Sequence, residues 1–235
     1  MAGGIGHILR NFAAGLLGPS PAELLRARLA AAPLPGGDAI ALPTVVFDLE
    51  TTGLRPTRGD ALVQIGAVRL EGGAEVGHFT TPVHPGRPIP AASTRYHGIT
   101  DAMVAGAPRI PAAVGAFRDF CAGAVLVAHN AAFDMTVLLM AERAGAPALP
   151  NPMLCSLQLA RWLDPAEPDL SLDGLCGRLG MVIEGRHQAL GDARATAELW
   201  RRLLARAAAR GATGLDEIRR RSRMAEAIAQ GAERF

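Results

Sequence analysis

The sequence lacks lysine altogether, so arginine is its only strongly basic residue. Its 24 basic and 22 acidic residues leave a formal net charge of +2. A charge this close to zero does not by itself indicate a nucleic-acid-binding protein. Aromatic residues are also scarce, at 4% of the chain. Their scarcity argues against an extended platform of stacked rings for long single strands of nucleic acid.

Cysteine and long apolar runs are scarce as well. The cysteines are odd in number and far apart, without a CxxC pair: Cys121, Cys155 and Cys176. This pattern argues against a disulfide framework or a zinc site and favours a reducing, cytoplasmic location. No run of about 18 apolar residues occurs, so we expect no stable insertion into a membrane.

A chain of 235 residues that is 49% hydrophobic is long enough for one sizeable core with terminal additions. We predict an N-terminal helical extension and linker over residues 1–40, a main domain over 41–210 and a helical tail over 211–235. The extension is read as one or two amphipathic helices before a Pro/Gly linker at Pro33–Gly37. It is either a solvated or docked appendage or, alternatively, a membrane-surface helix. Arginine clusters in the tail either face solvent or contact phosphates.

Within the main domain, the hydrophobic pattern indicates strands followed by alternating helices and strands. Three strands rich in Val and Ile are expected at Thr44–Glu50, Ala61–Leu70 and Ala74–Val83. Their short connections predict antiparallel pairing. The later elements are expected near residues 110–123 (helix), 124–129 (strand), 132–144 (helix), 152–157 (strand), 157–163, 171–180 and 189–210 (helices). This order predicts an α/β fold, with helices on both faces of a mixed sheet.

The first expected strand carries two carboxylates, Asp48 and Glu50, two positions apart. Side chains alternate along a strand, so these two point the same way while Phe47 and Leu49 point to the opposite face. Two like charges side by side require a cation, a retained proton or exposure at the strand end. Clustered carboxylate oxygens are the ligands that Mg²⁺ prefers.

Two further aspartates lie where a folded chain can bring them to this pair. Asp134 is in the first turn of a helix that follows a strand, and Asp192 is in the first turn of the last long helix. Alone, either carboxylate is explained by the helix dipole, which is worth about 0.3–1 kcal/mol. His187, five residues before Asp192, belongs on the loop leading into that helix. The joint pattern, not any single member, indicates a site.

Four segments carry a family resemblance: "FDLETTGL", "HGIT", "LVAHNAAFD" and "HQALGDA". In this order, between about Val45 and Leu204, they resemble the DEDDh family of 3′-to-5′ exonucleases. That family includes the proofreading subunit of bacterial replicative DNA polymerase. A histidine five residues before the last aspartate, where a sister group has tyrosine four residues before it, is typical of the His branch.

The resemblance implies a ribonuclease H-like fold and a two-metal site. Its ligands would be Asp48, Glu50, Asp134 and Asp192, with two Mg²⁺ (or Mn²⁺) ions as cofactors and His187 as general base. Such a metal pair neutralises a phosphodiester, acidifies a water and stabilises the departing oxygen. An imidazole is largely neutral at pH 7 and can take the proton of that water. The expected products are nucleoside 5′-monophosphates.

Residues after the first strand and at two other motifs are expected to contact the substrate. They are Thr51, Thr52, Gly53, Leu54, His97 and Asn130. The first three also fit a plain turn, Leu54 also fits the core, and Asn130 also fits a helix cap. We interpret His129 and the remaining histidines as structural or solvated.

The substrate is the least determined part. The "ETTG" segment resembles the DNA-proofreading members more than the oligoribonuclease branch, so we expect single-stranded DNA 3′ ends. The alternatives are an exoribonuclease and a non-catalytic subunit that binds a polymerase or nucleic acid. A DNA polymerase subunit is a candidate partner. Since no tethering segment or second domain is evident, a proofreading role and a stand-alone role in repair both stay open.

Overall fold

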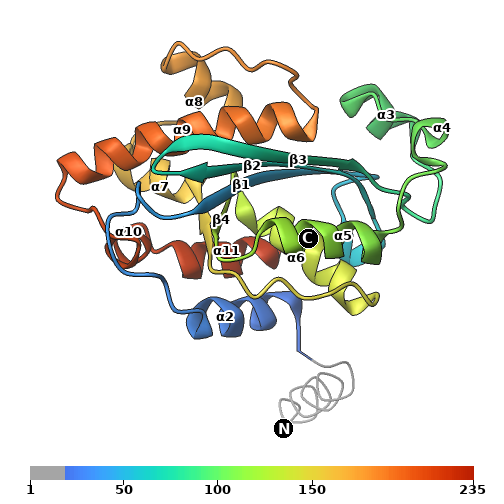
Figure 1. The fold of residues 1–235 in the computed structure, drawn as a ribbon, viewed down its shortest axis with the longest axis horizontal. Helices are drawn as coiled ribbons and strands as arrows, with labels where there is room; N and C mark the ends of the chain where they lie inside the picture. The colour runs from blue at the N-terminus through green and yellow to red at the C-terminus, as the bar shows by residue number, and fades with distance from the viewer. Residues whose placement is uncertain (1–18) are drawn as a thin grey trace, which may run out of the picture.

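The computed structural model describes residues 19–235. Its centre is a five-stranded sheet in the order β3-β2-β1-β4-β5 (Figure 1). The first three strands pair antiparallel, whereas β4 and β5 run parallel to β1. The strands are β1 (Thr44–Thr51), β2 (Leu62–Glu71), β3 (Ala74–Pro82), β4 (Val125–Ala128) and β5 (Met153–Cys155). The expected mixed α/β sheet is thereby confirmed.

The central strand β1 is covered on both faces. Val45, Val46 and Phe47 are fully buried, and the Phe47 ring packs against Phe117 with the ring centroids 5.3 Å apart. Only Asp48 interrupts this run with partial exposure. Because apolar side chains fill both faces of β1, its two carboxylates are part of a buried strand and do not lie on a solvated strand end.

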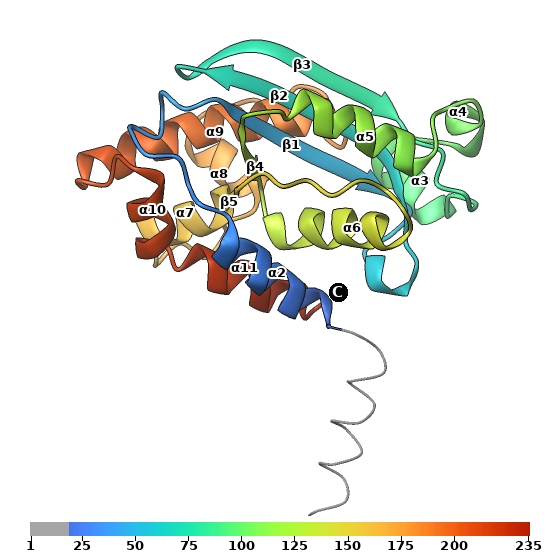
Figure 2. The same ribbon diagram turned by 60° about the horizontal axis from the view of Figure 1, so that its bottom comes forward.

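Helices cover the two faces of the sheet (Figures 1 and 2). The long helix α9 (Ala189–Ala209) packs on β1 and β2, while α5 (Ile110–Phe120) and α6 (Ala131–Arg143) lie on the opposite face. Next to α9 are α7 (Ser156–Leu163) and α8 (Leu172–Arg178). The position of α6 and α9 on opposite faces brings their first turns to the same end of β1.

The two ends of the described chain form one layer. Helix α2 (Pro21–Ala31) lies alongside α11 (Met224–Ala232), and α11 also packs on α6 (Figure 2). Leu25 and Leu29 of α2 are buried, so this helix docks on the protein and does not offer those side chains to a membrane surface. The other part of the predicted extension, residues 1–18, lies outside the described residues. The division into three segments stays a prediction.

Three short elements, one between β1 and β2 and two between β3 and α5, were not predicted from the sequence. They are η1 (Pro56–Arg58), α3 (Ala91–His97) and α4 (Asp101–Val104). The tail contains α10 (Leu215–Arg221) before α11, and the three arginines of α10 pair with acids of the same helix, as Arg220 does with Glu217 at 2.6 Å. Within residues 19–235, none of the helices combines the length and apolar character needed to cross a membrane.

Candidate functional site

Three acidic side chains meet beside the end of β1. Asp48 and Glu50 come from β1 and Asp192 comes from the first turn of α9. One carboxylate oxygen from each lies within 4.8 Å of the other two. Glu50 and Asp192 are buried, with exposures of 7% and 3%. The three carboxylates therefore form a cluster that water reaches only in part.

A glycine on β2 allows α9 to approach this closely. Gly66 pairs with Asp48 across the two strands. A Cβ atom on Gly66 would lie 2.1 Å from the backbone nitrogen of Leu190 and 2.2 Å from the carbonyl carbon of Ala189. Gln64 adds a bond, since its side-chain oxygen accepts the Ala189 N–H at 3.0 Å. Only glycine leaves the room for the start of α9 to lie on the sheet beside Asp48.

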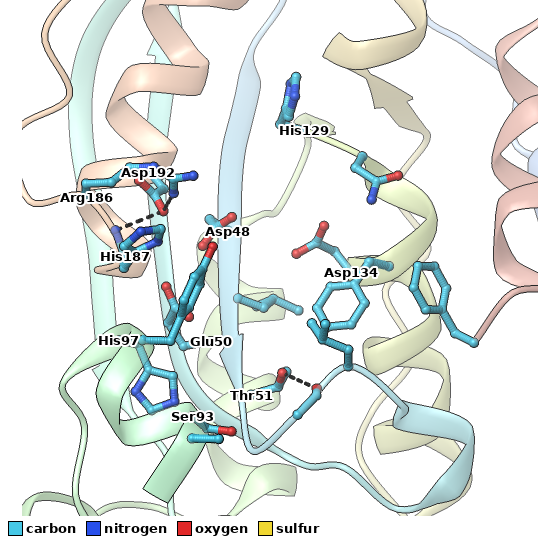
Figure 3. A pocket seen from close by; sticks show the side chains of 18 residues that line it. Asp48, Glu50, Thr51, Ser93, His97, His129, Asp134, Arg186, His187 and Asp192 are labelled. Atoms are coloured by element: carbon cyan, nitrogen blue, oxygen red, sulfur yellow. Dashed lines mark hydrogen bonds and ion pairs between the residues drawn. The ribbon is translucent and has the colours of Figure 1, made fainter. Parts of the chain in front are cut away.

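Asp134 faces this cluster from the opposite side. It lies in the first turn of α6, is 3% exposed, and Figure 3 shows Asp48 between Asp134 and Asp192. Its oxygens lie outside the 4.8 Å group of three, yet its charge acts on Asp48 and raises the pKa of that carboxyl. The four acids expected from the sequence therefore share one region, and Asp134 lies outside the group that the other three form.

Burial and mutual repulsion disfavour the ionised forms of these acids. Burial, followed by the charges of Asp134 and Glu50, raises the pKa of Asp48 well above its usual range. Burial and then Asp192 raise the pKa of Glu50 to about 8. Burial raises the pKa of Asp134 to about 7, and burial also raises that of Asp192. A bound cation would reverse this penalty.

The donor set suits a hard divalent cation. Among the described residues, Asp192 Oδ1 is buried without a hydrogen-bond partner. An oxygen of this kind costs free energy unless a proton or a cation meets it. The three grouped residues offer only carboxylate oxygens. Such a ligand set favours Mg²⁺ or Mn²⁺ over softer metals. The residues therefore fit the expected cofactor.

Arg186 is a part of the site that sequence reasoning missed. Its Nε and Nη2 atoms donate to both oxygens of Asp173 at 2.8 Å, and its Nη1 donates to Asp192 Oδ2. The guanidinium therefore joins an exposed acid to a buried one, and it acts against the rise in the pKa of Asp192. Its place directly before His187 is the only sequence signal for it.

His187 lies in the turn before α9, as expected. Its backbone N–H donates to Asp192 Oδ2 at 3.2 Å, and the Tyr96 ring from α3 lies against its imidazole with centroids 4.0 Å apart. Its φ of 62° is in the left-handed region, which is uncommon for a residue other than glycine. Within the described chain its Nδ1 is buried without a partner. These contacts hold the imidazole beside Asp192.

In the turn after β1, Thr52 is buried and Leu54 is exposed. Thr52 is 1% exposed and holds the turn together, because its hydroxyl donates to Asp60 and accepts from the Ala61 N–H. Thr51 donates to the Gly53 carbonyl at 2.7 Å. Leu54 is 74% exposed, so the alternative core role is wrong. Thr51, Gly53 and Leu54 line the cavity described below; Thr52 is not among its lining residues.

Three polar residues of the "HGIT" and "HNAAFD" segments also line this cavity. His97 Nδ1 accepts the Ile99 N–H, and burial lowers its pKa. Asn130 occupies the N-cap position of α6 with a φ of 61°, and its side chain makes no capping hydrogen bond. His129 hydrogen-bonds to Ser156 and to the Leu170 carbonyl, and burial lowers its pKa to about 4, as suits a structural residue.

The four acids open onto one cavity of about 710 Å³ (Figure 3). The acids, His187 and Arg186 lie on part of its wall, and an apolar part is formed by Leu54, Phe133 and Phe235. Phe133 precedes Asp134 directly, so the apolar and acidic parts adjoin. With cations on these carboxylates, a molecule that has an anionic group next to an apolar face would match this wall.

Comparison with known proteins identifies the family. The profile described as Exonuclease matches residues 45–200, which contain all four acids and His187. The chain belongs to the exonuclease family. The resemblance seen in the sequence is confirmed at this level. Helices α2, α10 and α11 lie outside the matched exonuclease region.

Curated relatives of this chain include longer proteins. It is 50% identical over 191 residues to the DNA polymerase III subunit epsilon-like protein of Rhodobacter capsulatus, covering 78% of this chain and 27% of that one. It is 40% identical over 155 residues to a PolC-type DNA polymerase III of Clostridium perfringens, covering 66% of this chain and 11% of that one. The matched region thus spans between about a tenth and a quarter of these relatives.

Solved exonuclease structures share the fold. A structure of exonuclease X in complex with 5′ overhanging duplex DNA superposes with a TM-score of 0.61 at 28% identity, covering 74% of this chain and 99% of that chain. Escherichia coli exonuclease I in complex with a dT13 oligonucleotide gives a TM-score of 0.62 at 17% identity, covering 71% and 42%. The first comparison supports the ribonuclease H-like exonuclease fold, and the second shows likeness of fold alone.

Proposed function

We propose that this protein is a metal-dependent 3′-to-5′ exonuclease that releases nucleoside 5′-monophosphates from the 3′ ends of single-stranded DNA. The observation that supports this most is the meeting of Asp48, Glu50 and Asp192 within 4.8 Å, in a cavity that also holds Asp134 and His187. Buried repelling carboxylates destabilise a fold unless they bind a cation. Their presence beside an imidazole favours catalysis over a purely structural use.

The four carboxylates would hold two divalent cations, Mg²⁺ or Mn²⁺. Bound cations supply Lewis acidity there: they offset the charge of a phosphodiester and acidify water. Asp48 is central to this role, because it lies between Asp192 on one side and Asp134 on the other (Figure 3). The Arg186 guanidinium already occupies one oxygen of Asp192, so its charge competes with a cation for that carboxylate.

His187 is the proposed general base. One imidazole nitrogen accepts the proton of the attacking water, and the Tyr96 ring keeps the imidazole from turning away. The backbone N–H of His187 donates a hydrogen bond to Asp192, a carboxylate of the cluster. The base is therefore placed next to the carboxylates before substrate binds, which is the pre-organisation that catalysis uses.

The remaining cavity wall is proposed to hold the last nucleotide. Thr51 and Gly53 offer polar atoms of a turn, His97 and Asn130 line the other side, and Leu54 offers an exposed apolar surface. A cavity of about 710 Å³ holds few nucleotides. Together with the low aromatic content, this favours an enzyme that grips the terminal nucleotides of a strand.

DNA is the proposed substrate and RNA the alternative. The exonuclease X relative was solved with 5′ overhanging duplex DNA, and curated relatives are named as DNA polymerase III proteins. A protein distinguishes the two polymers by contacts to the 2′ position. Degradation of matched DNA and RNA oligonucleotides decides between them, and faster loss of RNA would reverse this assignment.

Association with a DNA polymerase is proposed on the same relatives, with a cytoplasmic location. The matched region is only 27% of the Rhodobacter protein. The association therefore needs an experiment on this chain itself. Recovery of the replicative polymerase's catalytic subunit in a pull-down at micromolar concentration supports a proofreading role. Recovery of nothing favours the stand-alone role.

The test of the proposed activity is degradation of a 5′-labelled single-stranded DNA with Mg²⁺, with Mn²⁺ and with chelator. We expect a ladder that shortens from the 3′ end, lost with chelator and in Asp192→Asn. Asp216→Asn is the matched control, because Asp216 is an exposed aspartate in the first turn of α10. Binding of DNA without any metal-dependent cleavage would favour the non-catalytic alternative.

A further inference from the structure

A residue far outside the matched exonuclease region lines the cavity. The family match ends at residue 200, yet Phe235 is part of the cavity wall together with Phe133 and Leu54. The Phe235 ring meets Phe133 edge-on, with centroids 5.3 Å apart and an angle of 71° between the ring planes. Edge-on pairs of this kind are a favoured aromatic geometry. The tail of the chain therefore contributes an aromatic surface to the proposed active site.

The tail is anchored on several elements, so Phe235 does not reach the cavity by a loose strand. Met224, Ile228 and Ala232 on α11 are buried. The Thr57 hydroxyl of η1 donates to the backbone oxygen of Phe235. Glu233 also pairs with Arg26 of α2 at 3.2 Å. Because η1 directly follows the Leu54 turn, these contacts link the tail to that turn.

A glycine sets the distance between α11 and α6. A Cβ atom on Gly231 would lie 2.7 Å from the Cβ atom of Ala132. Two carbon atoms that are not bonded to each other cannot approach this closely without strain. Ala132 precedes Phe133 in α6. The glycine therefore lets α11 come close to the residues that hold Phe133 and, one position further, Asp134.

We propose that Phe235 completes the wall against which the 3′-terminal nucleobase packs, with the α2–α11 layer holding it there. The inference rests on the proposed function. A terminal nucleotide has an anionic phosphate next to a flat apolar base, and this wall has carboxylates next to Leu54, Phe133 and Phe235. With the phosphate at cations held by the carboxylates, the base meets the apolar part. Phe235 thereby acts on substrate affinity and not on the chemical step.

The test uses a DNA oligonucleotide with 2-aminopurine as its 3′-terminal base and a non-hydrolysable terminal linkage, bound in Mg²⁺ so that no cleavage intervenes. Stacking quenches this fluorophore. We expect quenching with the wild-type protein, much less quenching with Phe235→Ala, and recovery with Phe235→Trp. The Kd should rise about 5- to 30-fold in Phe235→Ala for a normal 3′ base and change little for an abasic 3′ end. In cleavage assays, KM should rise by a similar factor with kcat nearly unchanged.

The matched control is Phe120→Ala, which removes a ring that packs on Phe79 away from the cavity. It should lose comparable stability without a change in Kd. Gly231→Ala tests the same inference without altering the wall, since it displaces α11 from α6. We expect it to weaken binding like Phe235→Ala, and Ala132→Gly added to it should restore binding by removing the contacting atom.

Three results would overturn the inference. One is an absence of quenching with the wild-type protein. Another is an equal rise in Kd for normal and abasic ends. The third is tighter binding in Phe235→Ala, which would mean that Phe235 blocks the cavity. Because the quenching readout needs no turnover, a protein that stacks the base but cleaves nothing would refute the proposed activity and leave this inference standing.

Discussion

Removing divalent cations should make the protein less stable as pH rises above 7. Burial raises the pKa of Glu50 from 4.5 to about 8 and that of Asp134 from 3.8 to about 7. A raised folded-state pKa adds stability that is full below the unfolded-state value and is lost as pH rises through the folded-state value. For Glu50 this loss of stability extends from about pH 4.5 to about pH 8. Its last part therefore falls between pH 7 and 8.

The expected loss of stability follows from the proton that Glu50 holds in the folded state but not in the unfolded state. Stability falls by about 1.4 kcal/mol per pH unit for each such proton. Between pH 7 and 9, Glu50 loses about 1.4 kcal/mol, and a domain of this size shifts in Tm by about 2–4 °C per kcal/mol. We therefore expect Tm to fall by about 4 °C. Below pH 6.5 the buried His129, with its pKa lowered to about 4, acts in the opposite direction, so the window starts at pH 7.

Thermal unfolding followed by circular dichroism from pH 7 to 9 measures this effect. In chelator the wild-type Tm should fall, and in Mg²⁺ it should stay nearly level, because the cation replaces the proton. Glu50→Gln should flatten the curve in chelator, whereas Asp216→Asn should reproduce the wild-type curve. A wild-type Tm that is constant or rises with pH in chelator would refute the electrostatic account, as would equal stabilisation by Mg²⁺ at pH 7 and pH 9.

Further predictions concern the groups around the acids. His187→Ala should lower kcat by about 10²–10⁴-fold in single-turnover assays with little change in the Kd of DNA; unchanged turnover would remove it from the mechanism. Tyr96→Ala should lower kcat less than His187→Ala, and Tyr96→Phe should keep it; equal losses would contradict the positioning role. Arg186→Gln should tighten Mn²⁺ binding about threefold or more by calorimetry, because the guanidinium on Asp192 competes with the ion; weaker binding would show that Arg186 mainly orients that ligand.

The local part of the site could be predicted from the sequence. Strand alternation places Asp48 and Glu50 on one side of β1, and a first-turn position places Asp134 and Asp192 at helix starts. Both rules act over a few residues, so the sequence carries them directly. The position of His187 on the turn before α9 follows in the same way.

The remaining part depends on contacts between distant segments. Tyr96 reaches His187 from α3, a short helix with no clear hydrophobic period, and Phe235 reaches Phe133 from the end of the described chain. Nothing in the sequence around Arg186 shows that its guanidinium bonds to both Asp173 and Asp192. Leu54 fits a core position by composition, but the turn after β1 projects it outward. Such features arise from tertiary packing, which overrides local preference.

Anomalous diffraction from crystals soaked in Mn²⁺ tests the central claim most directly. We expect two peaks about 3.5–4 Å apart, among the carboxylates of Asp48, Glu50, Asp134 and Asp192. The same soak of Asp192→Asn crystals should lose at least one peak. Absence of any peak among these carboxylates, with Mn²⁺ bound elsewhere on the protein, would contradict the account.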